Sequence, residues 1–208
     1  MEKPAWPVCS TVDMDYSIYK AIDGTGPHFL HAPLKFAATD LVFVIVAMVV
    51  VTFLMPWRAH RLERRTGAVL ATVSAGIALL LVMPISNAVD RVRPFVAHPH
   101  AKLLISHGRD PGFPSDHATG AFAMAMALWL YDRTIGAIAF VLAAIVAFAR
   151  VYVGVHYPGD VIGGALIGMA VALIIYLTPL RSVVARIAAW CSDLWERILG
   201  LTPVRSAP

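Results

Sequence analysis

Charged residues are scarce in this sequence. Its 208 residues include 17 Lys or Arg and 13 Asp or Glu, so only 14% are charged, whereas a soluble domain carries about 25%. Hydrophobic residues make up 59%, and the mean hydropathy is +0.71. Because surface grows nearly as fast as mass, one soluble core of this size cannot hide so much apolar surface. The composition therefore excludes a soluble enzyme and a disordered binder, and it predicts an integral membrane protein.

Cysteine is also rare, and the basic residues are not spread over a soluble face. Cys9 and Cys191 are too far apart in sequence to frame a metal-binding motif. The net charge is +4, but the dense arginine cluster at residues 58–65 lies between two apolar runs, as in loops that stay in the cytoplasm. We therefore expect the lipid bilayer, and no nucleic acid, as a partner. Residues 1–10 lack a basic stretch followed by an apolar one, so we expect no cleaved signal peptide.

Five apolar segments are candidates for crossing a bilayer, which takes about 20 residues per helix. They are residues 36–57, 66–89, 118–131, 134–149 and 161–180. The third is short unless Ser115, Asp116 and His117 form its polar first turn. Residues 13–23 and 181–199 mix charged with apolar side chains, and each forms either an interfacial amphipathic helix or a surface helix packed on the bundle. The predicted fold is all-α: one domain of residues 1–208, a membrane bundle of about five transmembrane helices with interfacial amphipathic helices at both ends.

Basic residues predict how the bundle is oriented. Placing the cluster at residues 58–65 inside also places Arg133, Arg181 and Arg186 inside. The loops of residues 90–117 and 150–160 then share the outer face. These two loops hold nearly all the polar chemistry, and seven of the eight histidines fall on that side.

Residues that bind anions cluster at three helix ends on this outer face. The segments are Arg91-Val92-Arg93-Pro94, Phe113-Pro114-Ser115-Asp116-His117, and Arg150 followed by His156 and Asp160. A single arginine at the end of an apolar span is typical of an anchor whose charge reaches the headgroups. Several arginines beside a serine at a helix N-cap instead predict a phosphate site. The forked donors of arginine match phosphate oxygens, and a helix N-terminus attracts negative charge.

Two histidines extend this prediction from binding to reaction. His156 and Asp160 are four residues apart, so on a helical turn their side chains share a face. A carboxylate that accepts one imidazole N–H leaves the other nitrogen free to attack or to take a proton. His117 comes from a different helix end and can donate a proton to a leaving oxygen. The pattern predicts phosphoryl transfer through a covalent intermediate.

The three segments resemble the motifs of the type 2 phosphatidic acid phosphatase superfamily. That family's patterns are Lys-x6-Arg-Pro, Pro-Ser-Gly-His and Ser-Arg-x5-His-x3-Asp, and the resemblance covers residues 86–160. It implies that His156 is a nucleophile that forms a phosphohistidine, that Asp160 holds it, and that His117 is the general acid. It further implies that the phosphate oxygens are bound by Arg93, Ser115 and Arg150. No metal and no other cofactor is implied.

Three positions depart from the family's patterns. Ser86 stands where the first motif has lysine, Asp116 where the second has glycine, and Ala149 where the third has serine. Arg91 and Lys102 are candidates to replace the missing charge. Asp116 would place an acid beside the phosphate, which is unfavourable unless the carboxyl is turned away, protonated or paired with a base.

The segment of residues 113–117, together with Arg93-Pro94-Phe95-Val96, resembles the bacterial undecaprenyl-diphosphate phosphatase branch. This branch implies a polyprenyl diphosphate substrate, hydrolysed on the outer face of the cell membrane in support of cell-wall synthesis, and a link to bacitracin resistance. Phosphatidic acid and phosphatidylglycerophosphate remain alternative substrates, and a phosphotransferase with a lipid acceptor is a further variant. The non-enzyme alternative is a transporter. Transporter sites tend to lie near the membrane midplane, whereas the charged groups here lie at the ends of spans.

Other polar residues receive structural or accessory interpretations. His98, His100 and His107 with Asp110 have no spacing that fixes a metal geometry, and we favour contact with a second phosphate over a metal site. Asp40 is expected at headgroup level or paired with Lys35 rather than in catalysis. The glycines of the last span are expected to let a neighbouring helix approach closely. They are Gly163, Gly164 and Gly168.

Overall fold

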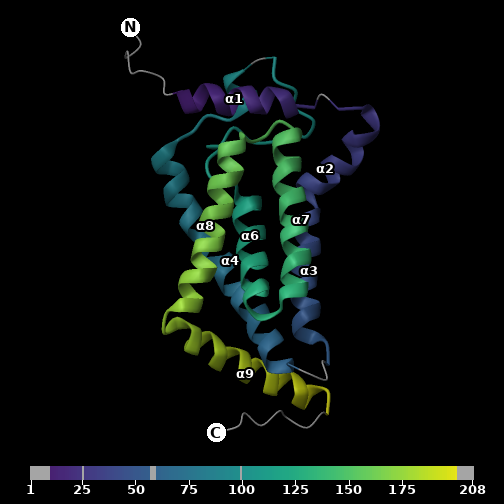
Figure 1. Cartoon of the computed structure of the whole chain (residues 1–208), viewed down its shortest axis with the longest axis vertical. Coiled ribbons are helices and arrows are strands. Elements are labelled where there is room, and N and C mark those ends of the chain that lie inside the picture. Colours follow the sequence, from purple (N-terminus) through teal and green to yellow (C-terminus); the bar gives the residue numbers. More distant parts are fainter. Residues whose placement is uncertain (1–9, 25, 57–59, 99, 201–208) are drawn as a thin grey trace.

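The regular structure of the protein is helical. The computed structural model describes residues 10–24, 26–56, 60–98 and 100–200, so Cys9 and Arg58 lie outside the described residues. The elements, labelled in Figure 1, are α1 (Ser10–Ile22), η1 (His28–Leu30), α2 (His31–Thr39), α3 (Leu41–Leu54), α4 (Arg61–Val89), α5 (Pro94–Ala97), α6 (Asp116–Tyr131), α7 (Arg133–Tyr152), α8 (Pro158–Leu177) and α9 (Leu180–Ile198). The prediction of an all-α protein is confirmed.

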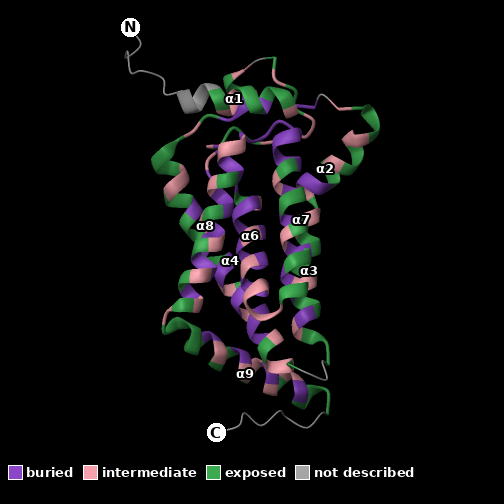
Figure 2. Cartoon of the chain, in the orientation of Figure 1, coloured by how far each residue is buried: buried purple, intermediate pink, exposed green. Residues whose placement is uncertain are grey.

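Helix α6 is the centre of the bundle. It packs most extensively against α8, α4 and α7, and these helices run alongside it in Figure 1. Its alanines, among them Ala121 and Ala125, are fully buried, and such small residues let neighbouring helices approach closely. Figure 2 shows buried residues along α6, whereas much of α3, α7 and α8 is exposed. The bundle therefore has its core inside and an apolar exterior.

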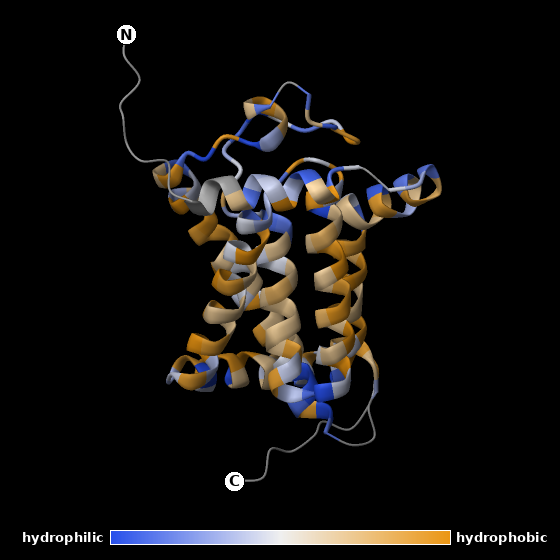
Figure 3. Cartoon of the chain, turned by 45° about the horizontal axis from the view of Figure 1, so that its top comes forward, coloured by the Kyte–Doolittle hydropathy of each residue, from blue (hydrophilic) through white to orange (hydrophobic). Residues whose placement is uncertain are grey.

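That exterior identifies a membrane protein. Many exposed side chains of α3, α4, α7 and α8 are large and apolar, for example Phe43, Leu80, Val141 and Leu166. Figure 3 shows hydrophobic stretches along the middle of the helices and hydrophilic residues at both ends. Apolar residues gather on an exterior when the surrounding solvent is lipid.

The helices suited to crossing the membrane follow most of the predicted segments. Among the described residues, three helical stretches are long and apolar enough, namely α7, α8 and the stretch that begins with α4. The predicted segment of residues 36–57 is divided at Asp40. There the stretch of η1 and α2 meets α3 at an angle of 49°, and the pair counts as a fourth candidate. Helix α6 takes the place of the predicted segment 118–131 and has 16 residues, fewer than the roughly 20 that a lone span needs.

The amphipathic segments at the two ends of the sequence form α1 and α9, which cross opposite ends of the bundle (Figure 1). We call these the α1 end and the α9 end. Helix α9 buries one face, which includes Ser192 and Glu196, and exposes Ile187 and Trp190 on another. It thus combines the two predicted roles, because it packs on the bundle and also presents an apolar face outward.

The basic cluster before the second span belongs in part to a helix rather than to a loop. Helix α4 begins at Arg61, and Arg65 is fully buried. Arg65 Nη1 donates to Glu196 Oε1 at 2.6 Å, and Arg61 Nη1 donates to the same oxygen at 3.1 Å. A buried charge needs such a partner. These arginines therefore hold α9 against α4.

Candidate active site

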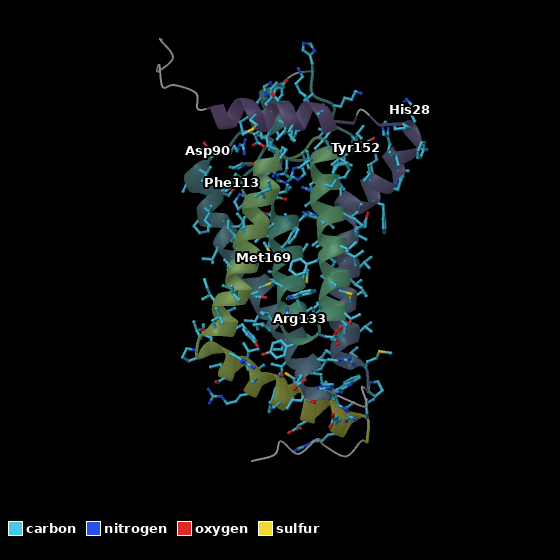
Figure 4. The ribbon with its side chains drawn as sticks, viewed as in Figure 1. His28, Asp90, Phe113, Arg133, Tyr152 and Met169 are labelled. Atoms are coloured by element: carbon cyan, nitrogen blue, oxygen red, sulfur yellow. The ribbon has the colours of Figure 1, made fainter. Side chains whose placement is uncertain are left out.

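Three helix ends and a loop meet at the α1 end. Arg150 lies in the last turn of α7, and His156 lies in the turn between α7 and α8. Arg93 and Ser115 are the N-cap residues of α5 and α6. All four side chains are at least 96% buried. In Figure 4 the labelled residues Phe113 and Tyr152 lie toward this end and Arg133 toward the other. The predicted phosphate-binding and catalytic residues thus come together at one end of the bundle.

The imidazole of His156 has a defined orientation. Its Nδ1 lies 2.9 Å from the carbonyl oxygen of Gly112, so Nδ1–H donates to that oxygen. The unprotonated Nε2 then faces two guanidinium groups, at 3.3 Å from Arg93 Nη1 and 3.3 Å from Arg150 Nη2. Burial and these two arginines lower the pKa of His156 well below its ordinary value of 6.5. At neutral pH, His156 is therefore uncharged, and the lone pair of its Nε2 is directed between two cations.

Asp160 supports this histidine differently from what the four-residue spacing predicts. Its Oδ2 lies 3.6 Å from His156 Nδ1 and instead accepts a hydrogen bond from the backbone N–H of Tyr157 at 2.8 Å. Asp160 occupies the third position of α8, where a carboxylate that reaches back stabilises the start of a helix. The carbonyl of Gly112, from a distant loop, takes the place at Nδ1 that we predicted for Asp160.

The two arginines are held in place by backbone carbonyls. Arg93 donates through Nε to Asp110 O at 2.9 Å and through Nη1 to Val155 O at 3.1 Å, and it forms an ion pair with Asp110 at 2.7 Å. Arg150 donates through Nη1 to Ala38 O at 3.2 Å. Among the described residues, no carboxylate forms an ion pair with Arg150. A buried arginine without a counter-ion favours binding of an anion at this point.

His107 is a member of the site whose place the sequence did not specify. Its Nε2 lies 3.0 Å from Arg150 Nη2, and its ring lies 6.4 Å from that of His156. Burial and Arg93 lower its pKa below 6.5, so it is neutral at pH 7. By contrast, His98 stacks on Tyr16 of α1 at 3.8 Å. No spacing signal distinguished these loop histidines. In the part of the chain that the structure describes, no three His, Cys, Asp or Glu side chains form a metal-binding group.

The first turn of α6 supplies the other predicted residues. The Ser115 hydroxyl is fully buried and has no hydrogen-bond partner within the described residues, as expected for a group that binds a ligand. His117 is half-buried, and its electrostatic partners include Arg150 and His156. Asp116 is exposed and interacts electrostatically with Arg93.

An apolar groove leads to these residues from the membrane-facing side of the bundle. It has a volume of about 490 Å³ and lies between α3, α4 and α6. Its lining consists of Val42, Phe43, Val46, Val49, Val50, Thr72, Ala75, Leu79, Asp116, His117, Gly120 and Met124. Because His117 lines the groove and lies in the first turn of α6, next to Ser115, the groove connects apolar surface to the anion site.

The remaining predicted residues have other partners in the structure. Arg91 pairs with Asp15 of α1 and with Asp160, so its charge is already used. Lys102 directs Nζ to the carbonyl of Gly24 at 3.4 Å. Ser86 lies in the last turn of α4, where its carbonyl accepts a hydrogen bond from the backbone N–H of Asp90, the C-cap residue of the helix. Both candidates for replacing the missing lysine are thus engaged elsewhere, and the neutral imidazole of His107 lies beside Arg150.

Asp40 belongs to the bend between α2 and α3. It is exposed at the break between α2 and α3, where its carboxylate accepts a hydrogen bond from Thr39. Lys35 contributes its backbone carbonyl to the same Thr39 hydroxyl. The structure thus places Asp40 at the bend of the helix pair rather than in the site.

Comparison with known proteins agrees with the motifs. The family model of the PAP2 superfamily matches residues 66–183. The chain belongs to the PAP2 superfamily. The match runs from the second turn of α4 to the first residues of α9 and includes Arg93, Ser115, Arg150 and His156. It leaves α1, α2 and α3 outside.

Relatives resemble this PAP2 protein over most of its length. Undecaprenyl-diphosphatase BcrC of Bacillus subtilis is 31% identical, over 84% of this chain and 91% of the relative. Putative undecaprenyl-diphosphatase YbjG of Escherichia coli is 30% identical, over 84% and 87%. The crystal structure of Aquifex aeolicus LpxE has a TM-score of 0.67 at 23% identity, over 77% of this chain and 93% of that one. At that identity, the structural likeness shows a shared fold.

Proposed function

We propose that this PAP2 protein is a membrane lipid diphosphate phosphatase that hydrolyses undecaprenyl diphosphate to undecaprenyl phosphate and phosphate. The observation that carries the proposal is the unprotonated Nε2 of His156, which lies within 3.3 Å of one guanidinium nitrogen each of Arg93 and Arg150. Attack by a neutral imidazole on a phosphorus atom requires that the phosphate oxygens be held and their charge balanced. The two arginines and the Ser115 hydroxyl supply both.

The reaction follows from this geometry in two steps. In the first, the lone pair of His156 Nε2 attacks the terminal phosphorus, and the bond between that phosphorus and the bridging oxygen breaks. His117, protonated when the negative charge of the diphosphate is bound beside it, gives its proton to the departing lipid phosphate, and a phosphohistidine remains. In the second, His117 takes a proton from water, the water oxygen attacks phosphorus, and the bond to Nε2 breaks. Phosphate leaves, and both histidines return to their starting states.

The lipid substrate is supported by the groove and by the relatives. The groove presents apolar side chains of α3, α4 and α6 and ends at His117, so a chain lying in it would place its headgroup at the arginines. BcrC is described as an undecaprenyl-diphosphatase and YbjG as a putative undecaprenyl-diphosphatase, and both match most of this chain. A transporter site near the midplane is not favoured, because the buried phosphate-site residues gather at the α1 end.

We further propose that the site faces the outside of a bacterial cell membrane. Arg61, Arg64, Arg65 and Arg133 lie at the α9 end, opposite the site. Lys and Arg concentrate on the cytoplasmic side of membrane proteins. The α1 end is then the outer one, where the carrier lipid would be regenerated.

The test is release of phosphate by purified full-length protein. We expect release from C55 diphosphate in the presence of a chelator, and slower release from phosphatidic acid and phosphatidylglycerophosphate. His156→Ala and His117→Ala should abolish it, whereas His60→Ala at the α9 end serves as the matched control and should not. Oxygen from isotopically labelled water should appear in the phosphate, which separates hydrolysis from transfer to a lipid acceptor. Undiminished release by His156→Ala would refute the proposal.

A further inference from the structure

Helix α1 contributes a carboxylate to the structure that supports the nucleophile. It crosses the α1 end of the bundle (Figure 1) and lies outside residues 66–183 of the family match. Asp15, on this helix, accepts through Oδ1 a hydrogen bond from the backbone N–H of Gly159 at 2.8 Å. Gly159 is in the first turn of α8, whose N–H groups have no partner within the helix. Asp15 therefore satisfies one of these donors from another helix.

The second oxygen of Asp15 binds Arg91, which connects it to Asp160. Arg91 donates through Nη2 to Asp15 Oδ2 and through Nη1 to Asp160 Oδ1, the latter at 2.8 Å. Its guanidinium also lies over the ring of Tyr157, 4.4 Å from the centroid. The side chain of Asp15 is 13% exposed and that of Asp160 is fully buried. One arginine thus balances two carboxylates that are largely shielded from water.

Asp160 in turn fixes both sides of the reaction site. Its side chain accepts from Tyr157 N–H, which holds the turn that carries His156. Its backbone carbonyl accepts from Ser115 N–H at 3.1 Å, which holds the start of α6. A shift of Asp160 would therefore move the nucleophile and the phosphate-binding serine relative to each other.

We propose that Asp15 is a positioning residue, which acts through Arg91 and Gly159 to hold Asp160 and the turn of residues 156–160. It touches no substrate, and it directs His156 Nε2 toward the phosphorus atom. Arg91, a candidate to replace the motif's lysine at Ser86, then serves this connection rather than the phosphate. The proposal rests on the proposed function, since it assumes that His156 is the nucleophile.

A purely structural role for Asp15, which would only dock α1, predicts different behaviour. Helix α1 is also held by aromatic contacts, because Tyr19 is fully buried and packs edge-on against Tyr157 at 5.6 Å, while Tyr16 stacks on His98. These contacts remain when the Asp15 carboxylate is replaced by an amide. Asp15→Asn should therefore leave α1 docked and loosen the turn of residues 156–160.

The experiment compares kcat and KM of Asp15→Asn, Asp15→Glu and wild type on C55 diphosphate. The rates are divided by the number of active sites, which is counted by trapping the phosphohistidine. Misplacement of a reacting group by about 1 Å costs up to roughly 100-fold in rate. We expect Asp15→Asn to lower kcat by about 10- to 100-fold and to slow phosphohistidine formation in a single turnover. KM should change little, because no substrate contact is lost. Asp15→Glu keeps the carboxylate and should recover most of the rate. The matched control is Glu63→Gln, an exposed carboxylate at the α9 end, which should behave as wild type.

A double-mutant cycle tests the route through Arg91. If Asp15 acts through Arg91, adding Asp15→Asn to Arg91→Gln should cost much less than Asp15→Asn alone. Three results would each overturn the positioning role. The first is a double variant whose loss of kcat is the product of the two single losses, and the second is a kcat of Asp15→Asn within about twofold of wild type. The third is an equal loss of kcat in Glu63→Gln. If Asp15→Asn does not fold, Asp15→Glu still decides, because its kcat must recover with the carboxylate. An inactive wild type would contradict the proposed function, whereas an active wild type with an equally active Asp15→Asn would contradict this proposal alone.

Discussion

Replacing Gly164 by alanine would force α8 away from α6 where the two helices carry the site. A Cβ atom at Gly164 would lie 2.7 Å from the backbone oxygen of Ser115 and 2.8 Å from Thr119 Oγ1. Ordinary contact begins at 3.4 Å, and backbone cannot rotate aside as a side chain can. Helix α6 would therefore move by about 0.7 Å at its first turn, which holds Ser115 and His117.

The expected cost follows from that displacement. Overpacking of this kind destabilises a protein by about 1–3 kcal/mol. Since a 1 Å misplacement can cost roughly 100-fold in rate, we expect kcat to fall by about 10- to 100-fold. The assay is phosphate release at saturating C55 diphosphate, together with thermal unfolding in the same detergent.

Gly76→Ala provides the matched control, because a Cβ at this exposed position of α4 meets no atom within 4 Å. This variant should keep wild-type kcat and gain up to about 1 kcal/mol of helix stability. If Gly164→Ala also kept wild-type kcat and unfolding temperature, the close approach of α8 to α6 would not set the geometry of the site.

Three further outcomes are expected. Because burial, Arg150 and Arg93 lower the pKa of His156, the loss of kcat/KM through protonation of His156 should lie below pH 6.5. Arg93→Gln removes one cation and raises this pKa, so the loss should move to higher pH, and an unmoved profile would contradict the assignment. Glu196→Ala leaves buried Arg65 without its carboxylate and should lower the free energy of unfolding by about 3–5 kcal/mol, with kcat unchanged; a loss below about 1 kcal/mol in denaturant titration would argue against that pairing. Val46→Trp should fill the groove and raise KM for C55 diphosphate about tenfold, equal to about 1.4 kcal/mol, but leave KM for a short-chain diphosphate unchanged. An equal rise in KM for both lipids would mean that the polyprenyl chain of the substrate does not lie in this groove.

Much of the fold could be predicted because it depends on composition and local periodicity. Long apolar runs must lie in lipid, and their backbone groups are satisfied there by helices, so the predicted segments 66–89, 134–149 and 161–180 correspond closely to α4, α7 and α8. The bend at Asp40 was not predicted, since one acid in an apolar run does not by itself break a helix. The interpretation of the fifth span's glycines agrees with the structure, where Gly164 and Gly168 meet the backbone of α6.

The candidate site likewise consists of residues that the sequence indicated and of contacts that it did not indicate. Motif spacing along the chain indicated His156, Arg150 and Arg93, because each lies at a helix end and offers chemistry that phosphate requires. The sequence did not indicate that Gly112 rather than Asp160 accepts from His156, or that His107 joins Arg150. It also did not indicate that Asp15 and Arg91 connect α1 to Asp160. Those contacts join residues up to 144 positions apart, and no local periodicity encodes them. Only the packing of α1 and of the loop of residues 100–114 over the ends of α6, α7 and α8 brings these groups within hydrogen-bonding distance.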